Sequence, residues 1–371
     1  MKTICSLPAL HAVLVSSALG LSVAASHGQV IADHDFSTGD RLTSNPPHSV
    51  PWYFYQNPDS TATLEAVPGA IKFSIPAADS WRPAGALIPF AEPGGVTLDV
   101  GQTLRVRFSV SQSNMAMGTN NQGMRWGVFN YGDTAETRPI GDDPEMGAFP
   151  GANVTGYGTS FSLHANSDND MNWWFKRTDM ENGSLVGSSG AFTWWDDISY
   201  DVGIEEGTQV FFADELYHIE FVLLRVYEST MHVRVIISEE DGTVVFASSA
   251  LDDGLGGMDP FHTFDSVIFR AQVTGGTATG SVAGDPRAGI EEVLGTMSFT
   301  GFTVQVMDAE FWNDLPVEFD LQNRAWVDSP LLGFMMVEYA PWVWVESLQS
   351  WLYLPEHDAE GSWVFSPGVG Q

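Results

Sequence analysis

The stretch Tyr217-His-Ile-Glu-Phe-Val-Leu-Leu-Arg-Val-Tyr227 is followed by a short polar segment, Glu228-Ser-Thr230, and then by Met231-His-Val-Arg-Val-Ile-Ile-Ser238. Every second residue is apolar on both arms, at positions 217, 219, 221 and 223 and at positions 231, 233, 235 and 237. This period of two is typical of half-buried strands, whereas a helix would place its apolar residues three and four positions apart. The stretch therefore predicts a long antiparallel hairpin whose apolar faces join one core.

The same alternation recurs in other parts of the chain. Residues 104–110 alternate strictly, and residues 156–164 repeat the pattern. Turn residues separate these short apolar runs, since the chain has 37 Gly and 20 Pro, and no segment keeps a convincing helical period. We therefore predict an all-β protein in which residues 30–307 form an antiparallel jelly-roll β-sandwich.

Several motifs in this region are similar to those of secreted bacterial jelly rolls. They are Asp35-Phe-Ser-Thr-Gly-Asp-Arg-Leu42, Gly127-Val-Phe-Asn130, Gly156-Tyr-Gly158, Tyr217-His-Ile-Glu-Phe221, Phe264-Asp-Ser-Val-Ile-Phe269 and Phe299-Thr-Gly-Phe-Thr-Val304. The chain thus resembles the concanavalin A-like lectin/glucanase superfamily, with its LamG-like domains. Because these are strand and core motifs, the resemblance implies the fold more strongly than any function.

The first 25 residues have the features of a secretory signal peptide. Lys2 gives a positive start, residues 7–23 are mostly apolar, and both Val23-Ala24-Ala25 and Ala24-Ala25-Ser26 suit a signal peptidase. Cleavage would place the mature protein outside the cytoplasm, secreted or at the cell surface. It would also remove Cys5, the only cysteine, so the mature chain would have no disulfide. An uncleaved membrane anchor is the alternative interpretation.

The charge of the chain limits its partners. It carries 15 basic and 47 acidic residues, a formal net charge of −32. Such a surface repels nucleic acid and anionic membranes, and it disfavours unassisted binding of a strongly anionic polysaccharide. The acidic residues are scattered along the chain, so solubility in a salty medium is one explanation for the large negative charge. Bound Ca²⁺ is the alternative explanation. Asp168 and Asp170 are the candidate Ca²⁺ ligands, although a turn rich in Asp and Asn is the commoner meaning of such a segment.

The C-terminal part of the chain differs in composition. We predict a linker at residues 308–322 and a Trp-rich module of small β-hairpin repeats at residues 323–371. Trp-Val-x-Ser occurs three times, beginning at Trp326, Trp344 and Trp363. A unit of this length can hold one hairpin whose aromatic residues stack on its neighbours. The module either caps the sandwich with a small aromatic core or docks to the cell envelope, since both roles would bury tryptophan.

The sequence contains no recognised catalytic motif. Glucanases of the superfamily carry Glu-x-Asp-x-x-Glu on one strand, and the nearest match here, Glu318-Phe-Asp320, lacks the second Glu and lies beyond the sandwich. The alginate-lyase branch places Arg, Gln, His and Tyr on its concave sheet. Arg125, Tyr157 and His164 could take such places, but the surrounding motifs of that branch are absent.

The best site candidate in the sequence is aromatic. Trp173 and Trp174 form one pair, and Trp194 and Trp195 form a second pair farther along the chain. Sugars present C–H faces that stack on such rings, while nearby polar groups bond their hydroxyls. Tyr157, Arg125 and Arg177 complete the predicted ligand-binding residues. Packing of the rings within a loop over the sheet is the structural alternative.

From these observations we predict a secreted, non-catalytic carbohydrate-binding or cell-surface-associated protein whose partner is a glycan or a cell-envelope component. A polysaccharide-degrading enzyme, either a lyase or a glycoside hydrolase on a jelly-roll scaffold, is one alternative. A structural envelope protein is the other alternative. We expect no partnership with nucleic acid, no transmembrane span in the mature chain and no cofactor other than Ca²⁺.

Overall fold

The computed structural model describes the strands of two large sheets and of a smaller C-terminal sheet. The described residues are 28–56, 61–75, 84–113, 124–132, 138, 140–142, 154–161, 172–177, 192–194, 199–202, 215–271, 295–308, 311–312, 315–316, 318–319, 325–329, 333–336, 342–345 and 350–353. The predicted signal peptide lies outside them. Among these residues, no helix has the length and apolar character that crossing a membrane requires.

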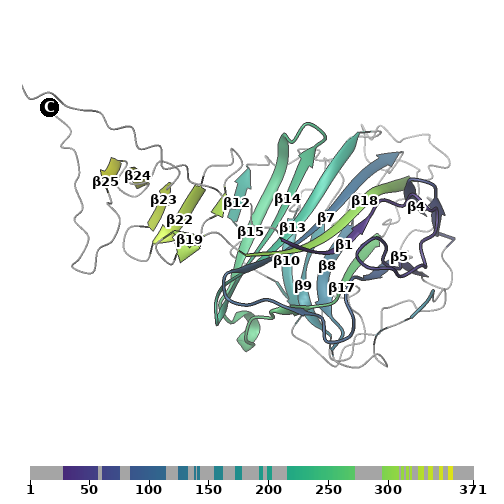
Figure 1. Ribbon diagram of the computed structural model, residues 1–371, viewed down its shortest axis with the longest axis horizontal. Helices are drawn as coiled ribbons and strands as arrows, with labels where there is room; N and C mark the ends of the chain where they lie inside the picture. The colour runs from purple at the N-terminus through teal and green to yellow at the C-terminus, as the bar shows by residue number, and fades with distance from the viewer. Residues whose placement is uncertain are drawn as a thin grey trace, which may run out of the picture.

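The larger sheet has nine strands. In spatial order they are β12 (Ser199–Val202), β15 (Val244–Asp252), β14 (Thr230–Glu239), β13 (Leu216–Tyr227), β7 (Gln102–Ser113), β18 (Gly295–Asp308), β4 (Ala70–Ile75) and β3 (Thr63–Val67), with β1 (Gln29–His34) on β18 beside β4. Every pair is antiparallel. These long strands form one layer of the molecule (Figure 1).

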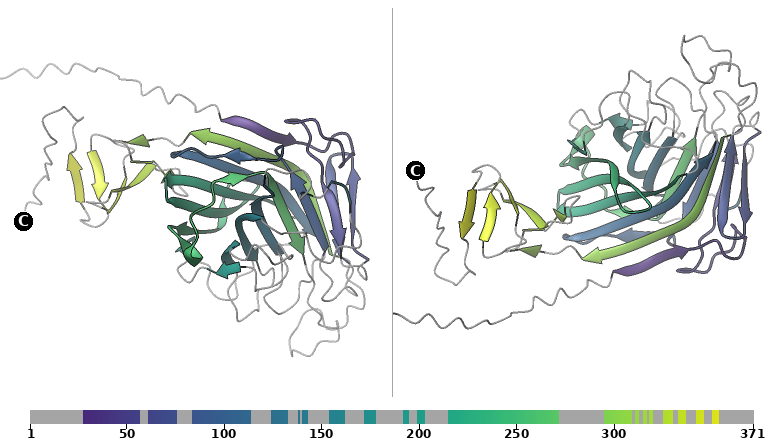
Figure 2. Two further views of the ribbon diagram at one scale, coloured as in Figure 1. Left: turned by 90° about the horizontal axis from the view of Figure 1, so that it is seen from below. Right: turned by 90° about the horizontal axis from the view of Figure 1, so that it is seen from above.

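The second sheet has seven strands and is also antiparallel throughout. In spatial order they are β11 (Phe192–Trp194), β10 (Asn172–Arg177), β9 (Thr155–Phe161), β8 (Met124–Asn130), β17 (Ser266–Ala271), β5 (Ala84–Pro89) and β2 (Tyr53–Gln56). The two sheets pack face to face as two layers (Figure 2). The predicted antiparallel jelly-roll β-sandwich is therefore confirmed.

The hairpin that predicted the fold lies in the centre of the larger sheet. β13 and β14 pair so that Ile219 is opposite Ile237, and Phe221 is opposite Val235. These four side chains are at most 2% exposed, because both arms turn their alternating apolar residues toward the other sheet. The periodicity of the sequence therefore predicted both the hairpin and the face that it buries.

Aromatic rings fill the space between the sheets. Trp126 of β8 stacks near Phe108 of β7 and Phe269 of β17, with ring centroids 4.8 Å away in each case. Trp52, just before β2, packs edge-on against Phe302 of β18 at 5.7 Å. All five rings are fully buried, so the aromatic content of the chain contributes largely to this core.

Short elements complete the sandwich. They are β6 (Val96–Thr97), which pairs with β16 (Thr263–Phe264), and the 3-10 turn η2 (Leu255–Gly257). At the β2 edge, the Asp142 carboxylate accepts the Phe54 N–H at 2.9 Å and forms a bidentate pair with Arg41. The Asp142 side chain thus accepts a hydrogen bond from the backbone of this edge strand, which helps to prevent the strand from pairing with another chain.

The chain continues beyond β18 into a separate sheet. After the short pair β19 (Phe311–Trp312) and β20 (Leu315–Pro316), five antiparallel strands follow in chain order. They are β21 (Glu318–Phe319), β22 (Ala325–Ser329), β23 (Gly333–Met336), β24 (Trp342–Val345) and β25 (Ser350–Tyr353). Figure 1 shows this sheet set apart from the sandwich. β21 lies within the segment predicted as a linker, so the sheet begins earlier than the predicted module.

Candidate functional site

One of the four tryptophans predicted to bind a sugar lies in the core of the sandwich. Trp174 of β10 is fully buried, and its Nε1–H donates a hydrogen bond to Ser248 Oγ of β15 at 3.1 Å. Its ring also lies 6.4 Å from that of Phe221. Since alternate residues of β10 face the other sheet, Trp174 is a core residue, and its assignment to a ligand site is corrected.

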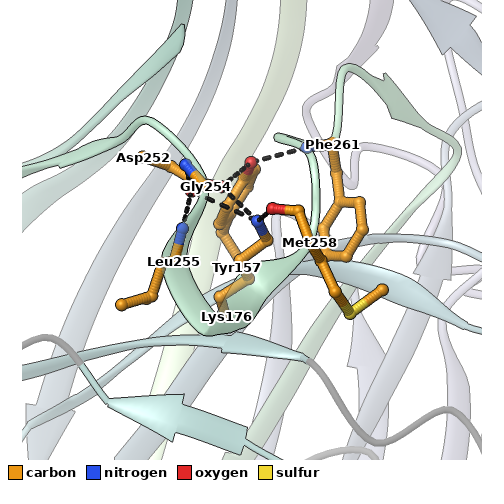
Figure 3. Close-up of polar contacts among 7 residues, drawn as sticks. All are labelled: Tyr157, Lys176, Asp252, Gly254, Leu255, Met258 and Phe261. Atoms are coloured by element: carbon orange, nitrogen blue, oxygen red, sulfur yellow. Dashed lines mark hydrogen bonds and ion pairs between the residues drawn. The ribbon is translucent and has the colours of Figure 1, made fainter. Parts of the chain in front are cut away.

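Tyr157 of β9 also faces the interior, where it joins a buried ion pair (Figure 3). Its hydroxyl donates to Asp252 Oδ2 at 2.7 Å, and Lys176 Nζ lies 2.8 Å from the same oxygen. Burial, and next the charge of Asp252, raises the pKa of Tyr157 well above its usual value, so the hydroxyl stays protonated and donates. Tyr157 is therefore not available as a ligand-binding group on the surface.

This ion pair holds the segment that contains η2. Asp252 Oδ1 accepts the backbone N–H groups of Gly254 and Leu255 at 3.1 and 2.9 Å. Lys176 Nζ donates to the Met258 carbonyl at 2.6 Å, and the Phe261 N–H donates to the Tyr157 hydroxyl at 2.7 Å. The network links both sheets to the segment that contains η2. Its polar groups have hydrogen-bond partners, which indicates a structural role.

The opposite, outward face of the seven-stranded sheet carries arginines. Arg125 of β8 and Arg270 of β17 are directly paired in the register. The same row continues through Gly85 of β5 to Tyr55 of β2. Neighbouring strands lie about 5 Å apart, so the two guanidinium groups originate side by side on this face. Arg177 of β10 lies farther along the sheet and is fully buried.

Burial controls the ionisation of this row. It lowers the pKa of Arg270 to about 10, and the charge of Arg125 lowers it further in the same direction. Both arginines remain charged at neutral pH. Burial raises the pKa of Tyr55 well above its usual value, and it does the same to Tyr131, which follows β8. Neutral phenols and charged guanidinium groups therefore occur close together in this part of the sheet.

Glycines and aromatic rings form the apolar floor beside the arginines. A Cβ at Gly127 would lie 2.2 Å from the Phe129 ring, and a Cβ at Gly158 would lie 2.3 Å from the Phe175 ring. Each ring therefore occupies the space above a glycine of the sheet. Phe129 and Phe175 belong to a second buried cluster, separate from the core between the sheets. The outward face is consequently a packed surface, and Arg125 is one of its partly exposed groups.

Acidic residues are missing from the strands of this sheet. None of the residues in β2, β5, β8, β9, β10, β11 and β17 is Asp or Glu, although the chain has 47 acidic residues. Asp265 precedes β17, where it accepts the Tyr131 N–H at 3.1 Å, and burial raises its pKa. Hydrolysis of a glycosidic bond by the usual route needs two carboxyl groups, and these seven strands supply neither.

A cavity of about 340 Å³ lies where the edges of the two sheets meet. Gln29 and Val30 of β1 line one side of it, and Tyr53 of β2 lines another. Arg138 and Glu92 supply charged groups, and the Arg138 guanidinium is held by a hydrogen bond to the Ala91 carbonyl at 2.5 Å. The size is that of a small-ligand site, which is typically about 300–1,000 Å³.

Apolar residues form part of the wall of this cavity. Four prolines contribute to it, together with Val30 and Ile140, which are 40% and 81% exposed. Tyr53 is half-buried and lies two residues before Tyr55, so the cavity adjoins the arginine row through β2. An aromatic ring, charged groups and an apolar wall thus occur together, which suits an amphipathic ligand.

Several predicted site residues lie beyond the described residues. Trp195, Asp168 and Asp170 are among them, and for Trp173 and Trp194 the structure describes the backbone only. The backbone of Trp173 pairs with Ser160, which in turn pairs with Arg125. In the described part of the chain, no group of three His, Cys, Asp or Glu side chains is placed to hold a metal ion.

Sequence reasoning missed Arg270, Tyr53 and Arg138. Arg270 lies in an alternating strand, but only its pairing with β8 shows that it lies beside Arg125. Tyr53 and Arg138 are far apart in the sequence and meet only at the cavity. No local signal marks any of them as a ligand-binding residue.

Comparison with solved structures finds lectins and a glucanase. An endo-1,3-β-glucanase from Streptomyces sioyaensis is 14% identical, with a TM-score of 0.38 over 76% of this chain and 98% of that one. The Lotus tetragonolobus seed lectin is 13% identical, with a TM-score of 0.36 over 73% and 97%. The exoplasmic domain of VIP36, in a Ca²⁺- and mannose-bound form, is 9% identical, with a TM-score of 0.38 over 77% and 93%.

These neighbours are concanavalin A-like jelly-roll sandwiches, the class that the sequence motifs resemble. At such identities and TM-scores the similarity carries no argument about the activity of this chain. No family model matches the sequence, and no curated protein matches it.

Proposed function

We propose that this protein binds carbohydrate without cleaving it, and that the cavity between β1 and β2 is where a sugar is held. The observation that carries the proposal is the composition of that cavity: one half-buried tyrosine, an anchored arginine and a carboxylate around a space of about 340 Å³. Tyr53 offers a ring for stacking on a sugar face, while Arg138 and Glu92 offer a donor and an acceptor for hydroxyls.

Two features support binding over catalysis on the adjoining sheet. Its described strands contain no carboxylate pair of the kind used in glycoside hydrolysis. A lyase needs a base, and burial raises the pKa values of Tyr55 and Tyr131, which makes their phenols poor bases at neutral pH. The proposed role therefore remains that of a secreted or surface-associated binding protein, as the N-terminal sequence predicts.

Measuring glycan binding to the wild type and to Tyr53→Ala tests this role. Loss of ring stacking costs about 0.5–1.5 kcal/mol beyond the lost buried area, so affinity is expected to fall about tenfold. Tyr227→Ala is the matched control, because Tyr227 is 47% exposed and lies at the end of β13, on the other sheet.

A protein that binds no member of a broad glycan array, or binding that Tyr53→Ala and Tyr227→Ala leave equally unchanged, contradicts the proposal. The Trp173→Ala and Trp194→Ala variants test in the same assay whether the predicted aromatic residues also contribute. Release of reducing ends or unsaturated products during the incubation would show that the protein is an enzyme.

A further inference from the structure

The pair formed by Lys176 and Asp252 brings an amine and a carboxyl group into contact in the interior of the sandwich. Lys176 Nζ lies 2.8 Å from Asp252 Oδ2 and 3.2 Å from Oδ1, and both side chains are fully buried. The two residues are 76 positions apart in the sequence and lie on β10 and β15, which belong to different sheets. Holding two reactive groups together in this way replaces a chance collision and favours bond formation between them.

The groups around the Asp252 carboxylate are placed as amide formation requires (Figure 3). Oδ1 accepts the backbone N–H groups of Gly254 and Leu255 at 3.1 and 2.9 Å, and two such donors stabilise an oxygen on which negative charge develops. Oδ2 accepts the Tyr157 O–H at 2.7 Å, so the other oxygen has a proton donor beside it. One oxygen is therefore stabilised as an anion, while the other is prepared to leave as water.

Burial favours an uncharged product at this place. Two charges removed from water carry a large desolvation cost, and an amide made from them carries no charge. The hydrogen-bond partners of that amide are already present, since the Gly254 and Leu255 N–H groups would serve its C=O and the Met258 carbonyl its N–H. The Phe261 ring, 4.9 Å from Nζ, attracts the cation and opposes the reaction, but this attraction is small beside the cost of burying two charges.

We propose that Lys176 and Asp252 react to form an isopeptide bond, which converts the ion pair into a covalent cross-link between the two sheets. One proton passes from Nζ to Oδ2, and the neutral amine then attacks Cγ. The Nζ–Cγ bond forms and the Cγ–Oδ2 bond breaks. Oδ2 leaves as water and carries away two protons that Nζ has given up, so the reaction needs no oxidant and no second substrate.

Such a cross-link would give this chain the kind of stability that disulfides give to other secreted proteins. The only cysteine is Cys5, which lies in the predicted signal peptide, so we expect the mature chain to have no disulfide. A bond between residues 76 positions apart restricts the unfolded chain as a disulfide across the same loop would. The inference is independent of the proposed carbohydrate binding.

Mass spectrometry of the wild-type protein tests the proposal directly. The expected mass is that of the chain, from its measured N-terminus, less one water, a loss of about 18 Da. Proteolysis under denaturing conditions should give one peptide in which the segment around Lys176 is joined to the segment around Asp252, and fragmentation of that peptide locates the bond. A mass without this loss, or a water loss located at other residues, overturns the proposal.

Lys176→Arg keeps a cation at the site, but its guanidinium group is too weak a nucleophile to form the amide, so the loss of water should disappear. Lys72→Arg is the matched control, because Lys72 is exposed on β4, and it should show the loss in full. A loss of water that persists in Lys176→Arg contradicts the proposal. The wild type shows or lacks the bond by itself, so the test does not depend on the folding of a variant.

Tyr157→Phe tests the part that the hydroxyl plays, since it removes only the O–H beside the oxygen that leaves. Cross-linking of this variant is expected to be at least about tenfold slower than that of the wild type, because the leaving oxygen loses its proton donor. The fraction of cross-linked chains is measured by mass at successive times after cell-free synthesis. Equal rates in the two proteins would overturn the role given to Tyr157.

Discussion

At the scale of single residues, the most distinctive feature is a charged pair placed where no water reaches it. The side chains of Lys176 and Asp252 are both fully buried, 2.8 Å apart, and come from different sheets. Lys176 Nζ also lies 4.9 Å from the centroid of the Phe261 ring. A buried charge is tolerated when its partners are in place, and it becomes costly when one partner is removed.

Lys176→Met is expected to destabilise the protein by about 3–5 kcal/mol, because it leaves the Asp252 carboxylate buried without its cation. Urea unfolding followed by tryptophan fluorescence measures the change. Lys72→Met is the matched control, since Lys72 is exposed on β4 and should cost within about 0.5 kcal/mol. Equal costs for the two variants would show that the buried pair does not hold the fold together.

At the scale of secondary structure, β8 and β9 depend on glycine for a reason of packing. Gly127 and Gly158 are paired in the register, and aromatic rings occupy the space where their Cβ atoms would lie. Glycine normally weakens a strand, so its presence in two adjacent strand interiors indicates a close approach. Here the approach is that of the Phe129 and Phe175 rings to the sheet, which builds the floor next to Arg125.

Gly127→Ala is expected to destabilise the protein by about 1–3 kcal/mol, because the added methyl group would displace the Phe129 ring and also meets the Tyr157 carbonyl at 2.9 Å. Thermal unfolding measures this effect. Gly301→Ala on β18 serves as the control, since its nearest neighbour is a serine side-chain oxygen at 3.2 Å, which can give way more easily. A smaller cost for Gly127→Ala than for Gly301→Ala would contradict this account of the floor.

At the scale of the whole molecule, charge opposes the compact state. The chain has a formal net charge of −32, from 47 acidic and 15 basic residues. Mutual repulsion of like charges destabilises a folded protein, and salt screens it. Stability should therefore depend on ionic strength more than it does for a neutral protein.

Raising sodium chloride from 10 to 500 mM is expected to stabilise the protein by about 1–2 kcal/mol and to raise its melting temperature by about 2–8 °C. Differential scanning calorimetry measures the shift. A sugar-free osmolyte at equal osmolality controls for general solvent effects. A melting temperature that stays constant or falls over this range would show that the acids are paired or too well spaced to repel.

The sequence alone predicts the kind of fold and, where apolar residues alternate strictly, the face that a strand buries. An alternation of period two is a local property, and once Tyr217, Ile219, Phe221 and Leu223 are known to be apolar, only one face of that strand can enter a core. For the same reason adjacent residues of a strand, such as Trp173 and Trp174, must lie on opposite faces, but the sequence does not show which of the two faces outward.

Which residues are neighbours in space became clear only from the tertiary structure. It placed Trp174 and Tyr157 in the interior, and it brought Arg270 next to Arg125 through the pairing of β8 with β17. It also assembled the cavity from β1, β2 and Arg138. Strand order and register are set by contacts between distant segments, which no local pattern encodes, so the candidate site emerged only when the two sheets were packed.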